Sequence, residues 1–126
     1  MNRKEILEMP AGREMDALIA EKVIGWRIDE LTAYSPSGSS CARHPKGDWW
    51  LNYYSTDMDA AWEIVEKFVS KGYGVHVYRH GDWNDKNGKR YWQSYMDFRF
   101  PIVDADTAPL AICRAALLAV MDASSG

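Results

Sequence analysis

The chain has 126 residues, of which 47% are hydrophobic and 26% are charged, and its formal net charge is −3. This composition indicates one globular domain, residues 1–126, and excludes a chain that is disordered throughout. The small negative charge excludes a uniformly basic surface, so we expect no binding to long nucleic acid or to an anionic membrane.

The sequence contains no pattern typical of a targeting or membrane-spanning segment. The N-terminus is charged, and the most apolar stretch, Leu110–Met121, is far shorter than the ~20 residues that cross a bilayer. Two cysteines, Cys41 and Cys113, form no dense disulfide framework. We therefore expect reduced thiols and a cytoplasmic location.

The first two predicted helices lie near the N-terminus and in the middle of the chain. The first runs from about Gly12 to Gly25, with apolar residues three and four positions apart. The second opens at Ser55-Thr56-Asp57, whose side chains can cap a helix, and ends at Gly72. Its expected buried stripe consists of Trp62, Val65, Phe68 and Val69.

A third helix is predicted from Asp106-Thr107, with Pro109 tolerated in its first turn. Its apolar face is broad, so we expect it to be the most buried helix, with Cys113 as a small core residue. Residues 122–126 are expected to form a frayed tail.

Two strands with alternating polarity are predicted between the second and third helices. They are Gly74–Arg79 and Tyr91–Phe100, and Asn87-Gly88 in their connection favours a tight reversal. Two weaker strands, Trp26–Thr32 and Asp48–Tyr53, are predicted before the second helix, separated by a flexible loop over residues 34–47. The predicted fold is α/β (α+β), in the order α-β-β-α-β-β-α, with helices packed on a small, mainly antiparallel sheet.

Three blocks of the sequence resemble a known family. They are MPAGREMDALIAEKVIGW (Met9–Trp26), YSTDMDAAWEIVEKF (Tyr54–Phe68) and DADTAPLAICRAALLAV (Asp104–Val120). In these blocks the chain is similar to the phage ABA sandwich domain family of bacteriophages and prophages. The resemblance implies an α/β sandwich and a place in the host bacterial cytoplasm, and it brings no catalytic residues.

Residues suited to a metal or to nucleophilic catalysis are present but are poorly arranged. Cys41, His44, His76 and His80 are zinc-type ligands, yet residues 76 and 80 would lie ~13 Å apart along one strand. Cys41 lies near His44, but the sequence offers no orienting carboxylate or oxyanion element. We expect no metal, no cofactor and no enzymatic activity.

Aromatic and cationic residues gather on the predicted hairpin and before the second helix. Rings that stack beside cations that bind phosphate are the components of a nucleotide site. Tyr91, Tyr95 and Arg99 would share one strand face. The candidate ligand-binding residues are Arg79, His80, Trp83, Lys89, Arg90, Tyr91, Tyr95, Arg99, Trp49 and Tyr53.

Two functions remain open from the sequence. In the first, the protein binds and sequesters a small nucleotide immune signal of the host, as an anti-defence protein and a homo-oligomer. In the second, it is a protein–protein interaction module that binds a host or phage protein through its loop and hairpin tip, since Trp, Tyr and Arg also favour protein interfaces.

Overall fold

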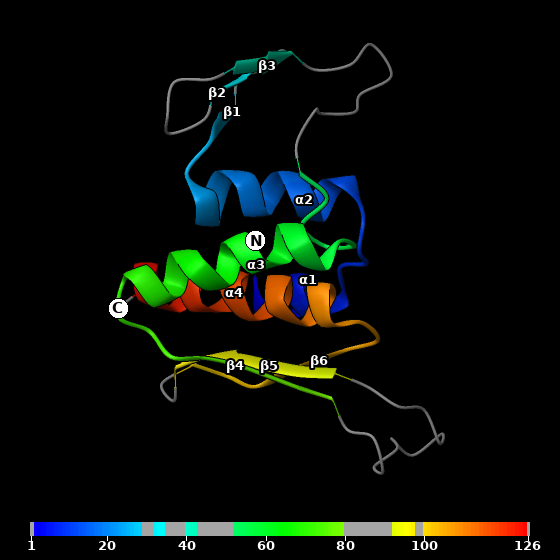
Figure 1. Cartoon of the computed structure of the whole chain (residues 1–126), viewed down its shortest axis with the longest axis vertical. Helices are drawn as coiled ribbons and strands as arrows, with labels where there is room; N and C mark the ends of the chain where they lie inside the picture. The colour runs from blue at the N-terminus through cyan, green and yellow to red at the C-terminus, as the bar shows by residue number, and fades with distance from the viewer. Residues whose placement is uncertain are drawn as a thin grey trace.

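The computed structural model describes residues 2–28, 32–34, 40–42, 52–79, 92–97 and 100–125. Two small antiparallel sheets lie at opposite ends of a group of helices (Figure 1). The elements are α1 (Arg3–Glu8), α2 (Arg13–Ile19), η1 (Ala20–Ile24), β1 (Arg27–Ile28), β2 (Thr32–Tyr34), β3 (Ser40–Ala42), α3 (Met58–Ser70), β4 (Val75–Arg79), β5 (Trp92–Met96), β6 (Val103–Ala105) and α4 (Ala108–Ser125). The predicted α/β class and the general order of helices and strands are confirmed.

The first predicted helix is present as α2 followed by η1, a wider turn of π-helix. Gly25 ends it with a φ of 102°, as the sequence predicted, and the backbone N–H groups of Gly25 and Trp26 both donate to the carbonyl of Ala20. A short helix that the sequence analysis missed, α1, precedes it. Its cap is Asn2, whose Oδ1 accepts a hydrogen bond from the N–H of Glu5 at 2.9 Å.

The second predicted helix is confirmed as α3, but its buried face differs from the predicted one. Asp57 caps it, and the buried residues are Ala61, Ile64, Val65 and Phe68. The predicted core residues Trp62 and Val69 are 50% and 55% exposed. Residues 62 and 69 are seven apart and lie about 90–100° around the helix from the centre of the buried stripe, which places them on its flank.

The third predicted helix, α4, is the centre of the core. It contacts all the other described helices and the three strands β4, β5 and β6, and most of its side chains, including Cys113, are buried. The helix continues to Ser125, through residues 122–125 of the predicted frayed tail. Met121 packs against the core and Asp122 pairs with Arg3 of α1 at 3.4 Å, which holds the last turns.

The predicted hairpin is confirmed as β4 and β5, which pair antiparallel, and β6 adds a third strand beside β5. The predicted second strand, Tyr91–Phe100, is too long, because β5 ends at Met96. The next residue, Asp97, has a φ of 65°, a left-handed conformation that interrupts a strand. The alternation expected as far as Arg99 and Phe100 therefore stops at this point.

The second sheet, β1-β2-β3, lies at the other end of the molecule, next to α2 in Figure 1. The predicted strand Trp26–Thr32 is present as two short strands, β1 and β2. The predicted loop over residues 34–47 includes β3, which pairs with β2. For the predicted strand Asp48–Tyr53, residues 48–51 lie outside the described residues, and Asn52 and Tyr53 are not in a strand.

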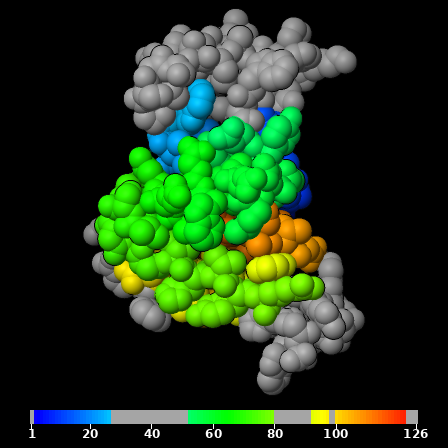
Figure 2. All heavy atoms as spheres, in the orientation of Figure 1, coloured from blue at the N-terminus to red at the C-terminus, as the bar shows by residue number. Residues whose placement is uncertain are grey.

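The described helices all lie on one side of the β4-β5-β6 sheet (Figure 1). Ser94 and Met96 of β5 face α4 and are fully buried, whereas Tyr78 on the opposite face is 47% exposed. In the space-filling view, α3 forms the front of the molecule and β4 forms the rim below it (Figure 2). Within the described part of the chain, the outer face of this sheet is therefore left open.

Candidate functional site

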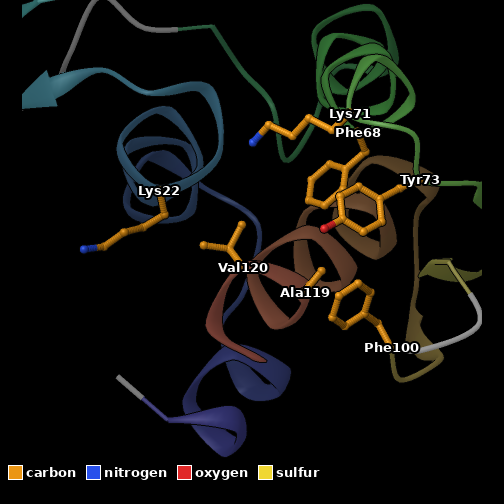
Figure 3. Close-up of a pocket in the computed structure, with 7 residues that line it drawn as sticks. All are labelled: Lys22, Phe68, Lys71, Tyr73, Phe100, Ala119 and Val120. Carbon is orange, nitrogen blue, oxygen red and sulfur yellow. The ribbon is translucent and has the colours of Figure 1, made fainter. Parts of the chain in front are cut away.

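A cavity of about 240 Å³ lies between η1, the C-terminal end of α3 and α4 (Figure 3). Its wall combines aromatic and aliphatic side chains with two lysines. The lining residues are Lys22, Phe68, Lys71, Tyr73, Phe100, Ala119 and Val120. The cavity is smaller than the ~300–1,000 Å³ typical of sites for drug-sized ligands, so it suits one planar ring system rather than a large molecule.

The aromatic wall is built by the turn that ends α3. Gly72 adopts a φ of 90°, and the N–H groups of Gly72 and Tyr73 donate to the carbonyls of Val69 and Phe68. This is the Schellman arrangement, in which the residue after the glycine packs back on the last turn of the helix. The Tyr73 ring accordingly meets Phe68 edge-on at 5.7 Å and Phe100 at 5.9 Å, so three rings form a continuous wall.

Two ammonium groups lie at the rim of this cavity. Lys71 is the C-cap residue of α3, and in Figure 3 its side chain and the Tyr73 hydroxyl point toward the same open space. Lys22 of η1 lies at the far edge, with its ammonium group turned outward and 3.1 Å from a carboxylate oxygen of Glu21. A ligand that carries both a flat ring and a negative charge matches this combination of groups.

A second group of rings lies on the open outer face of the β4-β5-β6 sheet. His76 and Tyr95 stack with centroids 4.3 Å apart and planes 13° from parallel, and Tyr78 lies 6.2 Å from both rings. The Tyr78 and Tyr95 hydroxyl oxygens are 3.5 Å apart, and this hydrogen bond is the largest contribution to a raised pKa of Tyr95. Because the His76 and Tyr95 rings stack, one face of each ring is covered by the other.

A buried polar cluster fixes the segment that leads into α3. The carboxylate of Asp16 is fully buried, and its Oδ1 accepts hydrogen bonds from the N–H and Oγ of Ser55 at 2.8 and 2.7 Å. Its Oδ2 accepts from Arg13 at 2.9 Å, and the Ser55 Oγ accepts from the N–H of Gly12. Since Asp16 and Ser55 are inaccessible to solvent, this cluster holds the structure together and does not contact a ligand.

Three of the ten predicted ligand-binding residues lie in the described part of the chain, and the structure does not bring these three together. Tyr95 is on the outer sheet face, whereas Arg79 lies at the end of β4 with its guanidinium 5.9 Å from the Trp92 ring. Tyr53 lies before α3 under Arg13 of α2, at 4.2 Å. The other seven lie outside the described residues, and their role stays a prediction: His80, Trp83, Lys89, Arg90, Tyr91, Arg99 and Trp49.

The sequence analysis missed the cavity because its residues come from four separate parts of the chain. One local signal was available, the pattern F-x-x-x-G-Y over residues 68–73, which predicts that Tyr73 folds back on Phe68. Lys22, Lys71 and Phe100 have no comparable signal.

The residues considered for metal binding or nucleophilic catalysis have separate locations. Cys113 is buried in α4 as predicted, and burial raises the pKa of its thiol. His76 stacks on Tyr95, while His44 and His80 lie outside the described residues. Among the residues with described side chains, no three His, Cys, Asp or Glu could hold one metal ion. No helix in the described ranges has the length and apolar character to cross a membrane.

The family model of the phage ABA sandwich domain matches residues 17–117. The chain belongs to the phage ABA sandwich domain family. The resemblance found in the sequence is thereby confirmed, and the matched range of this phage ABA sandwich protein contains five of the seven cavity-lining residues. Lys22, Lys71 and Tyr73 are among them.

A solved structure of a phage protein from Bacillus cereus ATCC 14579 is similar to this phage ABA sandwich protein. The TM-score is 0.60 and the sequence identity is 27%, over 87% of this chain and 91% of that chain. No curated protein matches the chain.

Proposed function

We propose that this phage ABA sandwich protein is a non-enzymatic accessory protein that binds a small nucleotide signal of host immunity and sequesters it. The observation that carries the proposal is the cavity whose wall combines the rings of Phe68, Tyr73 and Phe100 with the side chain of Lys71. A nucleobase can pack on such rings, and a phosphate can bind such an ammonium group.

The lining of the cavity supports binding without conversion. Its seven residues are lysine, phenylalanine, tyrosine, alanine and valine, with no carboxylate, imidazole or thiol to act as general base or nucleophile. A bound nucleotide would therefore leave the protein unaltered. The small volume favours one base inside the cavity, with its phosphate outside near Lys71 and Lys22.

Native mass spectrometry tests this proposal directly. The protein is purified from host cells with and without an active nucleotide-based defence, and both samples are compared. We expect an added mass only in the first sample, released intact on denaturation. If both samples show the same bare protein, the proposed sequestration is wrong.

The site is tested with the ligand so identified, or with ATP and a cyclic dinucleotide as probes, by calorimetry. Lys71→Ala should weaken binding about 10- to 100-fold, because a charged hydrogen bond is worth ~1.5–3 kcal/mol. The matched control is Lys67→Ala, which removes a lysine from the last turn of the same helix but outside the cavity lining. Equal affinity of the two variants would exclude this cavity as the site.

The second candidate, a protein–protein interaction module, is favoured by the open face of the β4-β5-β6 sheet, where Tyr78 is 47% exposed. Most of the loop and the whole hairpin tip proposed as the contact surface lie outside the described residues. In that function Trp83→Ala should abolish a complex with the partner, while arginine substitutions at the hairpin should matter less. A pull-down from host lysate that recovers no partner would count against it.

A further inference from the structure

Six side chains form a regular array on the outer face of the β4-β5-β6 sheet. The strand register places His76 opposite Tyr95, and Tyr78 opposite Gln93 and then Asp104. Continued by one residue, the β5–β6 register places Ile102 opposite Tyr95. The face therefore carries two rows across three strands: His76–Tyr95–Ile102 and Tyr78–Gln93–Asp104.

This array has the character of a protein interface. Ile102 is 60% exposed and Tyr78 is 47% exposed, and no described helix lies over them. Tyrosine is enriched where proteins meet, and an exposed apolar side chain is stabilised when a partner covers it. His76 and Tyr95 already stack on each other, so each ring has at most one face left for a base.

The hydrogen-bonding groups on this face are self-complementary. The array contains one acidic residue, Asp104, and one imidazole, His76, at diagonally opposite corners. Asp104 Oδ1 accepts from Gln93 Nε2 at 2.9 Å, and its second oxygen can accept a further hydrogen bond. Two copies can pack face to face about a two-fold axis that lies between the two sheets, parallel to them and perpendicular to that diagonal. Each His76 then lies opposite the partner's Asp104, and the contact is made twice.

We propose that two copies of this chain associate through the outer face of the β4-β5-β6 sheet, with reciprocal pairing of His76 and the partner's Asp104. The Ile102 and Tyr78 side chains of the two copies are buried between the sheets.

The outer face of the sheet is small, which limits the strength of the association. Three strands and two rows of side chains cover roughly 15 Å by 17 Å. This area is well below the ~800 Å² per partner that a stable complex buries, so the dimer is a weak one that forms only at high protein concentration.

The proposal is tested by sedimentation velocity of the full chain over a wide concentration range, together with a charge exchange. His76→Glu and Asp104→Lys each place like or unmatched charges at both contacts, and each should weaken dimerisation at least tenfold. The double variant H76E/D104K restores opposite charges and should bring the dissociation constant back to within about threefold of the wild type. A circular-dichroism melt of each variant confirms that it is folded.

Two further variants distinguish association through this face from non-specific association through other exposed apolar side chains. Ile102→Asp, which does not touch the charged pair, should also give a monomer. Trp62→Ala is the control, because Trp62 is a large exposed side chain on α3, away from the sheet. The proposal is overturned if the wild type remains monomeric at millimolar concentration, if the double variant fails to recover, or if only Trp62→Ala reduces association.

Discussion

The buried carboxylate of Asp16 gives the sharpest stability prediction. It joins the first turn of α2 to the segment before α3 by two hydrogen bonds from Ser55, and it accepts a third from Arg13 of the same helix. In Asp16→Ala, the buried N–H of Ser55 loses its acceptor, while the Ser55 Oγ can still donate to the Gly12 carbonyl 3.2 Å away. The perturbation therefore leaves one buried donor unpaired, removes a charged pair and opens a small cavity.

The expected loss in the free energy of unfolding follows from the unpaired donor and the broken charged pair. An unpaired buried donor costs ~1–3 kcal/mol, and breaking a buried charged pair by removing one partner costs ~3–5 kcal/mol in total. Because the Arg13 side chain is partly exposed, the loss of its partner adds less than in a fully buried pair. We expect Asp16→Ala to lower the free energy of unfolding by about 3–4 kcal/mol.

Urea denaturation followed by circular dichroism measures this loss, with an unchanged m-value as the sign that the unfolded states are comparable. The matched control is Glu14→Ala, because Glu14 lies in the same first turn of α2 but is exposed. This control should change the stability by no more than ~0.5 kcal/mol. A loss below ~1 kcal/mol in Asp16→Ala would refute the assigned role of the cluster.

Three further predictions concern single side chains. Burial, with the nearby Glu63 carboxylate, raises the pKa of Tyr54 from 10 to about 12. Between these values the unfolded chain loses the proton and the folded chain keeps it, so stability should fall as pH rises from about 10 to 12, and urea titrations of Tyr54→Phe should lack this fall. Cys113 should react with a thiol reagent only as fast as the protein unfolds, which peptide mapping of the labelled protein can measure. Phe68→Ala should lower the free energy of unfolding by ~3–5 kcal/mol and Trp62→Ala by less than ~1 kcal/mol in urea denaturation. The reverse order would mean that Trp62, and not Phe68, lies on the buried face of α3.

The ends of the helices were the best predicted parts of the fold because local chemistry determines them. Gly25 and Gly72 adopt positive φ values that favour glycine, and Asp57 caps α3 with its own side chain. The face of α3 was less predictable. The sets 61, 64, 65, 68 and 62, 65, 68, 69 both have helical spacing, and only the position of α4 decides that the first set is buried.

The candidate site was beyond sequence reasoning for a different reason. The cavity forms where η1, α3 and α4 meet. Its wall includes residues from distant parts of the chain, from Lys22 to Val120. No periodicity or short motif connects such positions.

The central position of α4 has a consequence for how the protein is made. Every other described helix, together with β4, β5 and β6, packs against this segment, which is translated after all of them. The apolar faces of α1, α2 and α3 therefore lack this common partner while the ribosome is still adding residues 108–125. During synthesis these faces escape aggregation if chaperones bind them or if the chain folds soon after α4 is made. A chain that ends before α4 would be open to degradation by host proteases.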